Sequence, residues 1–208
     1  EMALLAGHGA GISHNPMSNL RLGSGVAPLH RMRDASVGLG IGTDASNTSD
    51  GQNIFEAMRL AATLSRAATS DPAEWLSARA AFVMATEGSA ALMGLKNVGR
   101  IATGWAADLV FLDRNYCHYT PLRRALDQVV LAENGAAVRE VMIDGRTVFA
   151  EGRMQTIDEA ALAVRAHAAA DRIDHATRAA RITAEAAAMV VQSFCSRHCA
   201  ARLPSERI

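Results

Sequence analysis

A short apolar run that ends in Gly-Thr-Asp constrains this chain more than any other feature. Residues 37–43 are apolar or glycine up to the final threonine, and the chain turns polar after Asp44. This pattern predicts a buried strand that presents one carboxylate at its carboxyl end. In parallel α/β sheets the carboxyl ends of the strands carry the chemistry. We therefore expect Asp44 to be functional; the alternative is a plain helix N-cap, a common role for aspartate in a polar loop.

A second strand of the same kind is expected about thirty residues earlier. Residues 10–14 end in His14 and are followed by a polar loop, and residues 28–35 predict a helix with a proline in its first turn. Strand, helix and apolar strand in this order predict a right-handed parallel crossover. The carboxyl ends of the two strands would then bring His14 and Asp44 to one edge.

The rest of the chain predicts helices, then a small β region, then more helix. The hairpin signal is Asp144-Gly145 between two apolar runs. Thr86 is expected to cap a short helix, and the helix from residue 158 onward is expected to end near Pro204. Helices are expected over residues 2–8, 52–67, 71–85, 87–93 and from 158 onward, and strands over 109–112, 138–143 and 146–150.

Composition excludes several classes of protein. The chain has 21 basic and 21 acidic residues, so no basic field favours nucleic acid. The chain has no run of eighteen apolar residues, so its sequence does not predict a membrane span. The first residues do not have the pattern of a signal peptide. Three cysteines are an odd number, which disfavours a disulfide framework and favours the cytoplasm.

Three segments carry a family resemblance. Residues 13–25 (SHNPMSNLRLGSG), 42–44 (GTD) and 55–62 (FEAMRLAA) resemble the amidohydrolase superfamily. The likeness is to the branch that contains S-adenosylhomocysteine/methylthioadenosine deaminase, guanine and 8-oxoguanine deaminases, and the triazine chlorohydrolases. Residues 99–113 and the turn at 144–145 resemble that branch's β-sandwich. The resemblance covers residues 1 to about 157.

The resemblance implies a (β/α)8 barrel with one divalent metal, zinc or iron. Such a metal activates a water that attacks an sp2 carbon bearing an amino or halide group. The family's ligands are a His-x-His pair, a further histidine and an aspartate, and only the aspartate matches here, at Asp44, as metal ligand and proton acceptor. The chain contains no His-x-His pair, so by this likeness it corresponds to a C-terminal half, with the other ligands expected upstream of Glu1.

Other polar residues near these motifs are weaker candidates. His14, Asn15 and Asn19 are expected to shape the pocket wall and are possible substrate contacts, and Ser46 either orients groups around Asp44 or belongs to a plain turn. Near the end, Cys195, His198 and Cys199 could each bind metal. No fourth ligand accompanies them, so ordinary helix packing is the preferred interpretation.

The sequence therefore predicts an α/β chain: the C-terminal part of a TIM barrel with a small β-sandwich appendage and C-terminal helices. Expected domains are residues 1–95 (barrel), 96–157 (sandwich) and 158–208 (helical extension). The expected function is hydrolytic deamination of a purine-like or triazine-like heterocycle. Alternatives are dechlorination by the same chemistry, or an inactive fragment that acts as an assembly partner. A homo-oligomer or a complementing N-terminal half is the expected partner, with neither nucleic acid nor membrane.

Overall fold

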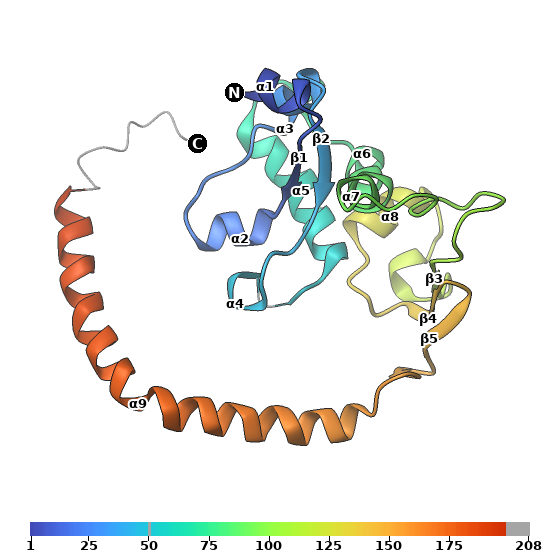
Figure 1. Cartoon of the computed structure of the whole chain (residues 1–208). Coiled ribbons are helices and arrows are strands. Elements are labelled where there is room, and N and C mark those ends of the chain that lie inside the picture. The colour runs from blue at the N-terminus through green and yellow to red at the C-terminus, as the bar shows by residue number, and fades with distance from the viewer. Residues whose placement is uncertain (50, 199–208) are drawn as a thin grey trace. The chain divides into compact units, whose positions relative to one another are not determined.

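The computed structural model describes residues 1–49 and 51–198 (Figure 1), and the chain divides into two units. Unit 1 spans Glu1–Gly152 and unit 2 spans Arg153–Ile208. None of the helices described is both long and apolar enough to cross a membrane.

Unit 1 begins with the expected parallel crossover. Helix α1 (Met2–Gly7) precedes β1 (Gly11–His14), and β1 pairs in parallel with β2 (Gly38–Ile41). The register places His14 opposite Ile41, so the two strands end together. Two short helices connect them, α2 (Pro16–Arg21) and α3 (Leu29–Asp34). The parallel pairing predicted from the sequence is confirmed, whereas α2 was expected to be loop.

Glycines allow a helix to approach β2 closely. A Cβ at Gly40 would lie 2.8 Å from Leu92 Cδ1, and a Cβ at Gly88 would lie only 2.2 Å from the carbonyl oxygen of Leu39. Ser89 strengthens this contact, because its Oγ accepts a hydrogen bond from the Ile41 amide at 3.1 Å and lies 2.9 Å from the Ile41 carbonyl. The end of β2 is thereby fixed to the helix.

The helices after β2 differ in part from the sequence prediction. Helix α4 (Ser46–Ser49) is a single turn, and α5 (Ile54–Ala68) matches the expected long helix, with Asn53 as its N-cap. The expected helix over 71–85 is instead a 3-10 turn (Pro72–Glu74) followed by α6 (Ala78–Val83). The break has a physical cause: Trp75 Nε1 donates to the Thr69 carbonyl and Ser77 caps the new helix by accepting from the Ala80 amide.

Thr86 is not the helix cap that the sequence predicted. Residues Met84–Gly88 form a π-helical turn that joins α6 directly to α7 (Ser89–Leu92), so no helix begins at Thr86. The Thr86 hydroxyl instead donates to the Phe82 carbonyl at 2.8 Å, within the same continuous helical run. That bond is the back-bonding which threonine makes in helix interiors.

The hydrophobic core of unit 1 lies between α5, β2 and the following helices. Ala61 and Ala62 are almost wholly buried, and the small side chains on this face of α5 let neighbouring elements pack closely. The buried apolar cluster consists of Leu29, Ile41, Ala57, Met58, Ala61, Ala62, Leu76, Ala81, Met84 and Val130.

A second, antiparallel sheet follows in unit 1. Strands β3 (Leu109–Leu112), β4 (Val138–Ile143) and β5 (Arg146–Ala150) pair in that order. Asp144 and Gly145 connect β4 to β5 with φ angles of 48° and 76°. Positive φ at both central residues is what a type I′ hairpin turn requires. The predicted hairpin is confirmed.

A buried carboxylate anchors the segment between β3 and β4. Helix α8 (Ala125–Leu131), which the sequence analysis did not predict, leads to Glu133, whose side chain is fully buried. Glu133 accepts from the Tyr119 hydroxyl at 2.7 Å and from three backbone amides. Burial alone raises the pKa of Glu133, but these hydrogen bonds outweigh it and the pKa lies below its usual value.

Unit 2 contains the short strand β6 (Arg153–Met154) and one long helix, α9 (Glu159–His198). Asp158 begins the helix by accepting a hydrogen bond from the Ala161 amide at 3.0 Å. Arg181 and Asp174 form an ion pair on its surface at 2.7 Å. The predicted C-terminal helix is confirmed as far as His198, whereas Pro204 lies outside the described residues.

Candidate functional site

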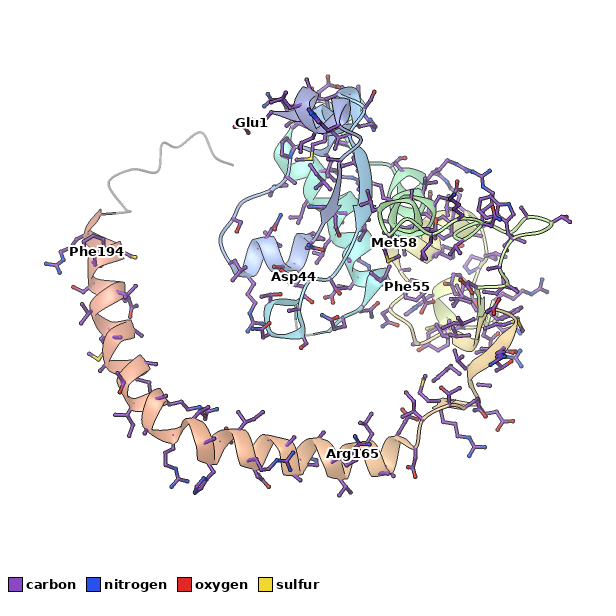
Figure 2. All side chains as sticks on the ribbon, viewed as in Figure 1. Glu1, Asp44, Phe55, Met58, Arg165 and Phe194 are labelled. Carbon is purple, nitrogen blue, oxygen red and sulfur yellow. The ribbon has the colours of Figure 1, made fainter. Side chains whose placement is uncertain are left out.

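Asp44 lies in the loop between β2 and α4, three residues after the last residue of β2 (Figure 2). The Gly42 amide donates to the His14 carbonyl at 3.0 Å, which extends the pairing of β1 and β2 to the start of this loop. Asp44 has a φ of 63°, a left-handed conformation that aspartate tolerates better than most residues. The carboxylate and His14 thus lie at the same edge of the parallel pair, as predicted.

Two donors hold the Asp44 carboxylate. Ser18 Oγ donates to Asp44 Oδ2 at 2.7 Å, and the Ala45 amide donates to Oδ1 at 2.7 Å. The hydrogen bond from Ser18, followed by that from Ala45, lowers the pKa of Asp44 below its ordinary value. The carboxylate is exposed and ionised at neutral pH, so it is suited to bind a cation or accept a proton.

The sequence analysis did not single out Ser18 or Gln52, which the structure connects to this loop. Ser18 is buried in α2, and Gln52 Nε2 donates to the Asp44 carbonyl at 2.8 Å. The only sequence signal for Ser18 is its place one helical turn after Asn15 in the same polar motif. Gln52 gives no such signal, because it lies eight positions after Asp44, beyond the single turn of α4.

His14 is buried beneath this edge. Only 3% of its surface is exposed, and its Nδ1 has no hydrogen-bond partner among the described residues. Burial lowers the pKa of His14 to about 4. His14 is therefore neutral at pH 7, and its ring can act only as a neutral donor or acceptor there.

The other three sequence candidates lie in or at the start of α2 and α4. Asn15 is the N-cap residue of α2, and its Oδ1 accepts from Ser13 Oγ at 3.4 Å. A Cβ at position 42 would lie 2.5 Å from Asn15 Oδ1, so Gly42 is what allows this close approach. Asn19 is half-buried in α2, and Ser46 is exposed at the start of α4. The serine that contacts the carboxylate is Ser18, on α2.

Asp44 fits a metal site as one ligand. It is an exposed, ionised carboxylate at the end of a parallel strand, and carboxylate oxygens are zinc ligands in proteins. Within residues 1–49 and 51–198, no three histidine, cysteine, aspartate or glutamate side chains gather around one point. Cys195 is exposed on α9, and Cys199 lies outside the described residues.

The sequence profile of the amidohydrolase family matches residues 1–148. The chain belongs to this family. It is 36% identical over 159 residues to 5-methylthioadenosine/S-adenosylhomocysteine deaminase of Dictyoglomus thermophilum, a match that covers 76% of this chain and 37% of that protein. It is also 36% identical over 160 residues to the enzyme of the same name from Bacillus thuringiensis (strain Al Hakam), with the same coverage.

Solved structures show the same likeness. An adenosine deaminase from Xanthomonas campestris with bound zinc superposes with a TM-score of 0.79 at 34% identity, over 84% of this chain and 40% of that one. Atrazine chlorohydrolase from Arthrobacter aurescens TC1 complexed with zinc gives 0.76 at 29% identity, over 81% and 37%. The chain thus has a mixed α/β fold of the TIM-barrel type, and it spans 37–40% of the length of these relatives. These matches confirm the family resemblance that was predicted from the sequence.

Proposed function

We propose that this chain is part of a metal-dependent hydrolase that deaminates an amino-substituted heterocycle, purine-like or triazine-like. One observation carries the proposal: an ionised, exposed carboxylate, Asp44, stands at the carboxyl end of β2 in a chain of the amidohydrolase family. The names of the relatives support it, because several are deaminases of adenine-containing compounds, and the matching adenosine deaminase and atrazine chlorohydrolase structures contain zinc.

In this proposal Asp44 is both a metal ligand and the acceptor of a proton. A zinc or iron ion bound there would lower the pKa of its water and supply a hydroxide at neutral pH. The hydrogen bonds from Ser18 and Ala45 use one lone pair on each carboxylate oxygen, so each oxygen keeps another for a metal or a proton. Ser18 holds the carboxylate in position, and His14, Asn15, Asn19 and Ser46 are the candidates for contacts to the substrate.

The domain assignment belongs to the same proposal. Residues 1–95 form a barrel portion, residues 96–157 a portion of a β-sandwich, and residues 158–208 a helical extension. The separate pairing of β3, β4 and β5 away from β1 and β2 supports the sandwich. We further propose that the chain acts as a homo-oligomer or with a complementing N-terminal half, since catalytic zinc sites use three protein ligands and Asp44 supplies one.

The experiment compares the chain alone with a chimera. In the chimera, the chain replaces the segment that it matches in the Dictyoglomus thermophilum deaminase. We expect the 208-residue chain alone to bind zinc weakly and to release no ammonia. The chimera should hold zinc and release ammonia from methylthioadenosine, and Asp44→Asn should abolish the release. Asp34→Asn, an exposed aspartate at the end of α3, is the matched control. A folded, zinc-loaded chimera that is inactive, or in which Asp44→Asn is active, would refute the proposal.

A second candidate function is hydrolytic dechlorination by the same water chemistry. The match to an atrazine chlorohydrolase favours it as the alternative. The two reactions differ in the group released, so the same chimera is incubated with atrazine and with methylthioadenosine. Chloride release with no ammonia would select dechlorination. A third alternative, an inactive assembly partner, would give neither product while still increasing the stability of its complementing half.

A further inference from the structure

A cleft lies in unit 1 where α5, α6 and α8 contact one another. Its volume is about 490 Å³, within the range of small-molecule sites in proteins. Side chains from the three helices, and from the residue that caps the start of α8, line the cleft. Among them are Ala62, Arg66, Arg79, Arg124, Asp127 and Leu131.

Three arginines meet at this cleft from distant parts of the sequence. Arg66 belongs to the last turn of α5, Arg79 to the first turn of α6, and Arg124 is the N-cap residue of α8. The one acidic residue in the lining is Asp127, which pairs with Arg124 at 2.8 Å. The cleft thus carries an excess of two positive charges in a chain whose basic and acidic residues are equal in number.

Two of the three guanidinium groups are available to a ligand. Arg66 and Arg79 are exposed, and within residues 1–49 and 51–198 no carboxylate lies within ion-pair distance of either. Arg66 lies over the ring of Trp75, 5.2 Å from its centroid. Among the described residues the Arg66 guanidinium donates no hydrogen bond, so its N–H groups remain for a ligand, and a guanidinium binds phosphate with two hydrogen bonds.

Apart from Ser77, the rest of the lining is apolar. Ala62 is buried, and Ala78, Leu126 and Leu131 add further apolar surface. We propose that this cleft binds a small phosphate monoester, with the phosphate at Arg66 and Arg79 and an apolar body against the alanines and leucines. A monoester carries a charge close to −2 at neutral pH, which matches the excess positive charge.

The proposed site is separate from Asp44 and does not rest on the proposed hydrolase function. Asp44 lies next to the beginning of α5, whereas Arg66 is twelve residues beyond Ile54, the first residue of that helix. Twelve residues of α-helix rise by about 18 Å. A ligand in the cleft therefore does not reach the carboxylate.

The first test is a titration with phenyl phosphate, followed through the fluorescence of Trp75. The chain has two tryptophans, so the Trp105→Phe variant isolates Trp75. We expect a saturable change, weaker binding of inorganic phosphate by about fivefold because it lacks the ring, and no response to phenol. Raised salt should weaken binding, since exposed charges are screened. No saturation by phenyl phosphate, equal affinity for inorganic phosphate, or binding of phenol would overturn the proposal.

The second test assigns the binding to the arginines. Arg79→Gln should weaken phenyl phosphate about tenfold, since it removes a charge-assisted hydrogen-bond donor. Arg79→Lys keeps the charge and should bind with intermediate affinity. Arg114→Gln removes another exposed arginine, one outside the lining, and should bind like the parent. Equal weakening by Arg79→Gln and Arg114→Gln would show a general charge effect and overturn the site.

Discussion

The contact of Gly88 with β2 gives a prediction in which two physical effects have opposite signs. Gly88 has helical angles, φ −63° and ψ −51°, and helix propensity alone predicts that Gly88→Ala stabilises the protein by about 1 kcal/mol. The new Cβ would, however, lie 2.2 Å from the carbonyl oxygen of Leu39. That atom is backbone within a paired strand, so no rotamer change relieves the overlap, and the helix must move by roughly 1 Å.

Overpacking of this kind costs about 1–3 kcal/mol, and the displaced helix also weakens the hydrogen bonds between Ser89 and Ile41. We therefore expect Gly88→Ala to lower the free energy of unfolding by about 2 kcal/mol net. Urea unfolding followed by tryptophan fluorescence measures it. Gly7→Ala is the control, because its Cβ meets nothing within 4 Å in α1. A Gly88→Ala variant as stable as the parent would refute the close-approach argument.

Three further predictions concern buried or strained residues of unit 1. Burial lowers the pKa of His14 to about 4, so as the pH falls His14 takes up a proton in the unfolded chain before it does so in the folded one; the contribution of His14 to stability is therefore complete above about pH 6.5 and falls by up to about 3 kcal/mol as the pH drops toward 4. His14→Phe should make the urea midpoint depend less on pH between pH 7 and 4.5, and the same pH dependence as in the parent would contradict this. Glu133→Gln should cost about 2–3 kcal/mol in urea unfolding, since the new amide N–H faces donors where the carboxylate accepted four hydrogen bonds; parent-like stability would argue against an ionised Glu133. Gly145→Val should cost about 1–2 kcal/mol from its φ of 76° alone, because a Cβ there meets nothing within 4 Å; an unchanged melting temperature would speak against the turn.

Local patterns predicted the elements whose signals are short-range. The apolar run that ends at Thr43 predicted β2 and its polar loop, and the Asp144-Gly145 pair predicted the hairpin. Both signals depend on residues that are adjacent in sequence. The parallel pairing of β1 and β2 was predicted from the order of elements rather than from any single residue.

The parts that sequence reasoning missed depend on contacts between distant residues. The helix expected over residues 71–85 is divided because the Trp75 indole hydrogen-bonds back to Thr69, which no helical periodicity reports. Thr86 looked like a cap, but the π-helical turn carries the backbone through it. Ser18 holds Asp44 across 26 residues of sequence, so its role is visible only once β1 and β2 are paired.

The length of α9 has a consequence for how unfolding is observed. Residues 159–197 are exposed along nearly the whole of this helix, so little packing supports it, and such helices melt gradually. Both tryptophans, Trp75 and Trp105, lie in unit 1. Far-ultraviolet circular dichroism should therefore show a broad transition where fluorescence shows a sharp one. Probes that disagree usually indicate a folding intermediate, but in this chain the disagreement would record the gradual melting of α9.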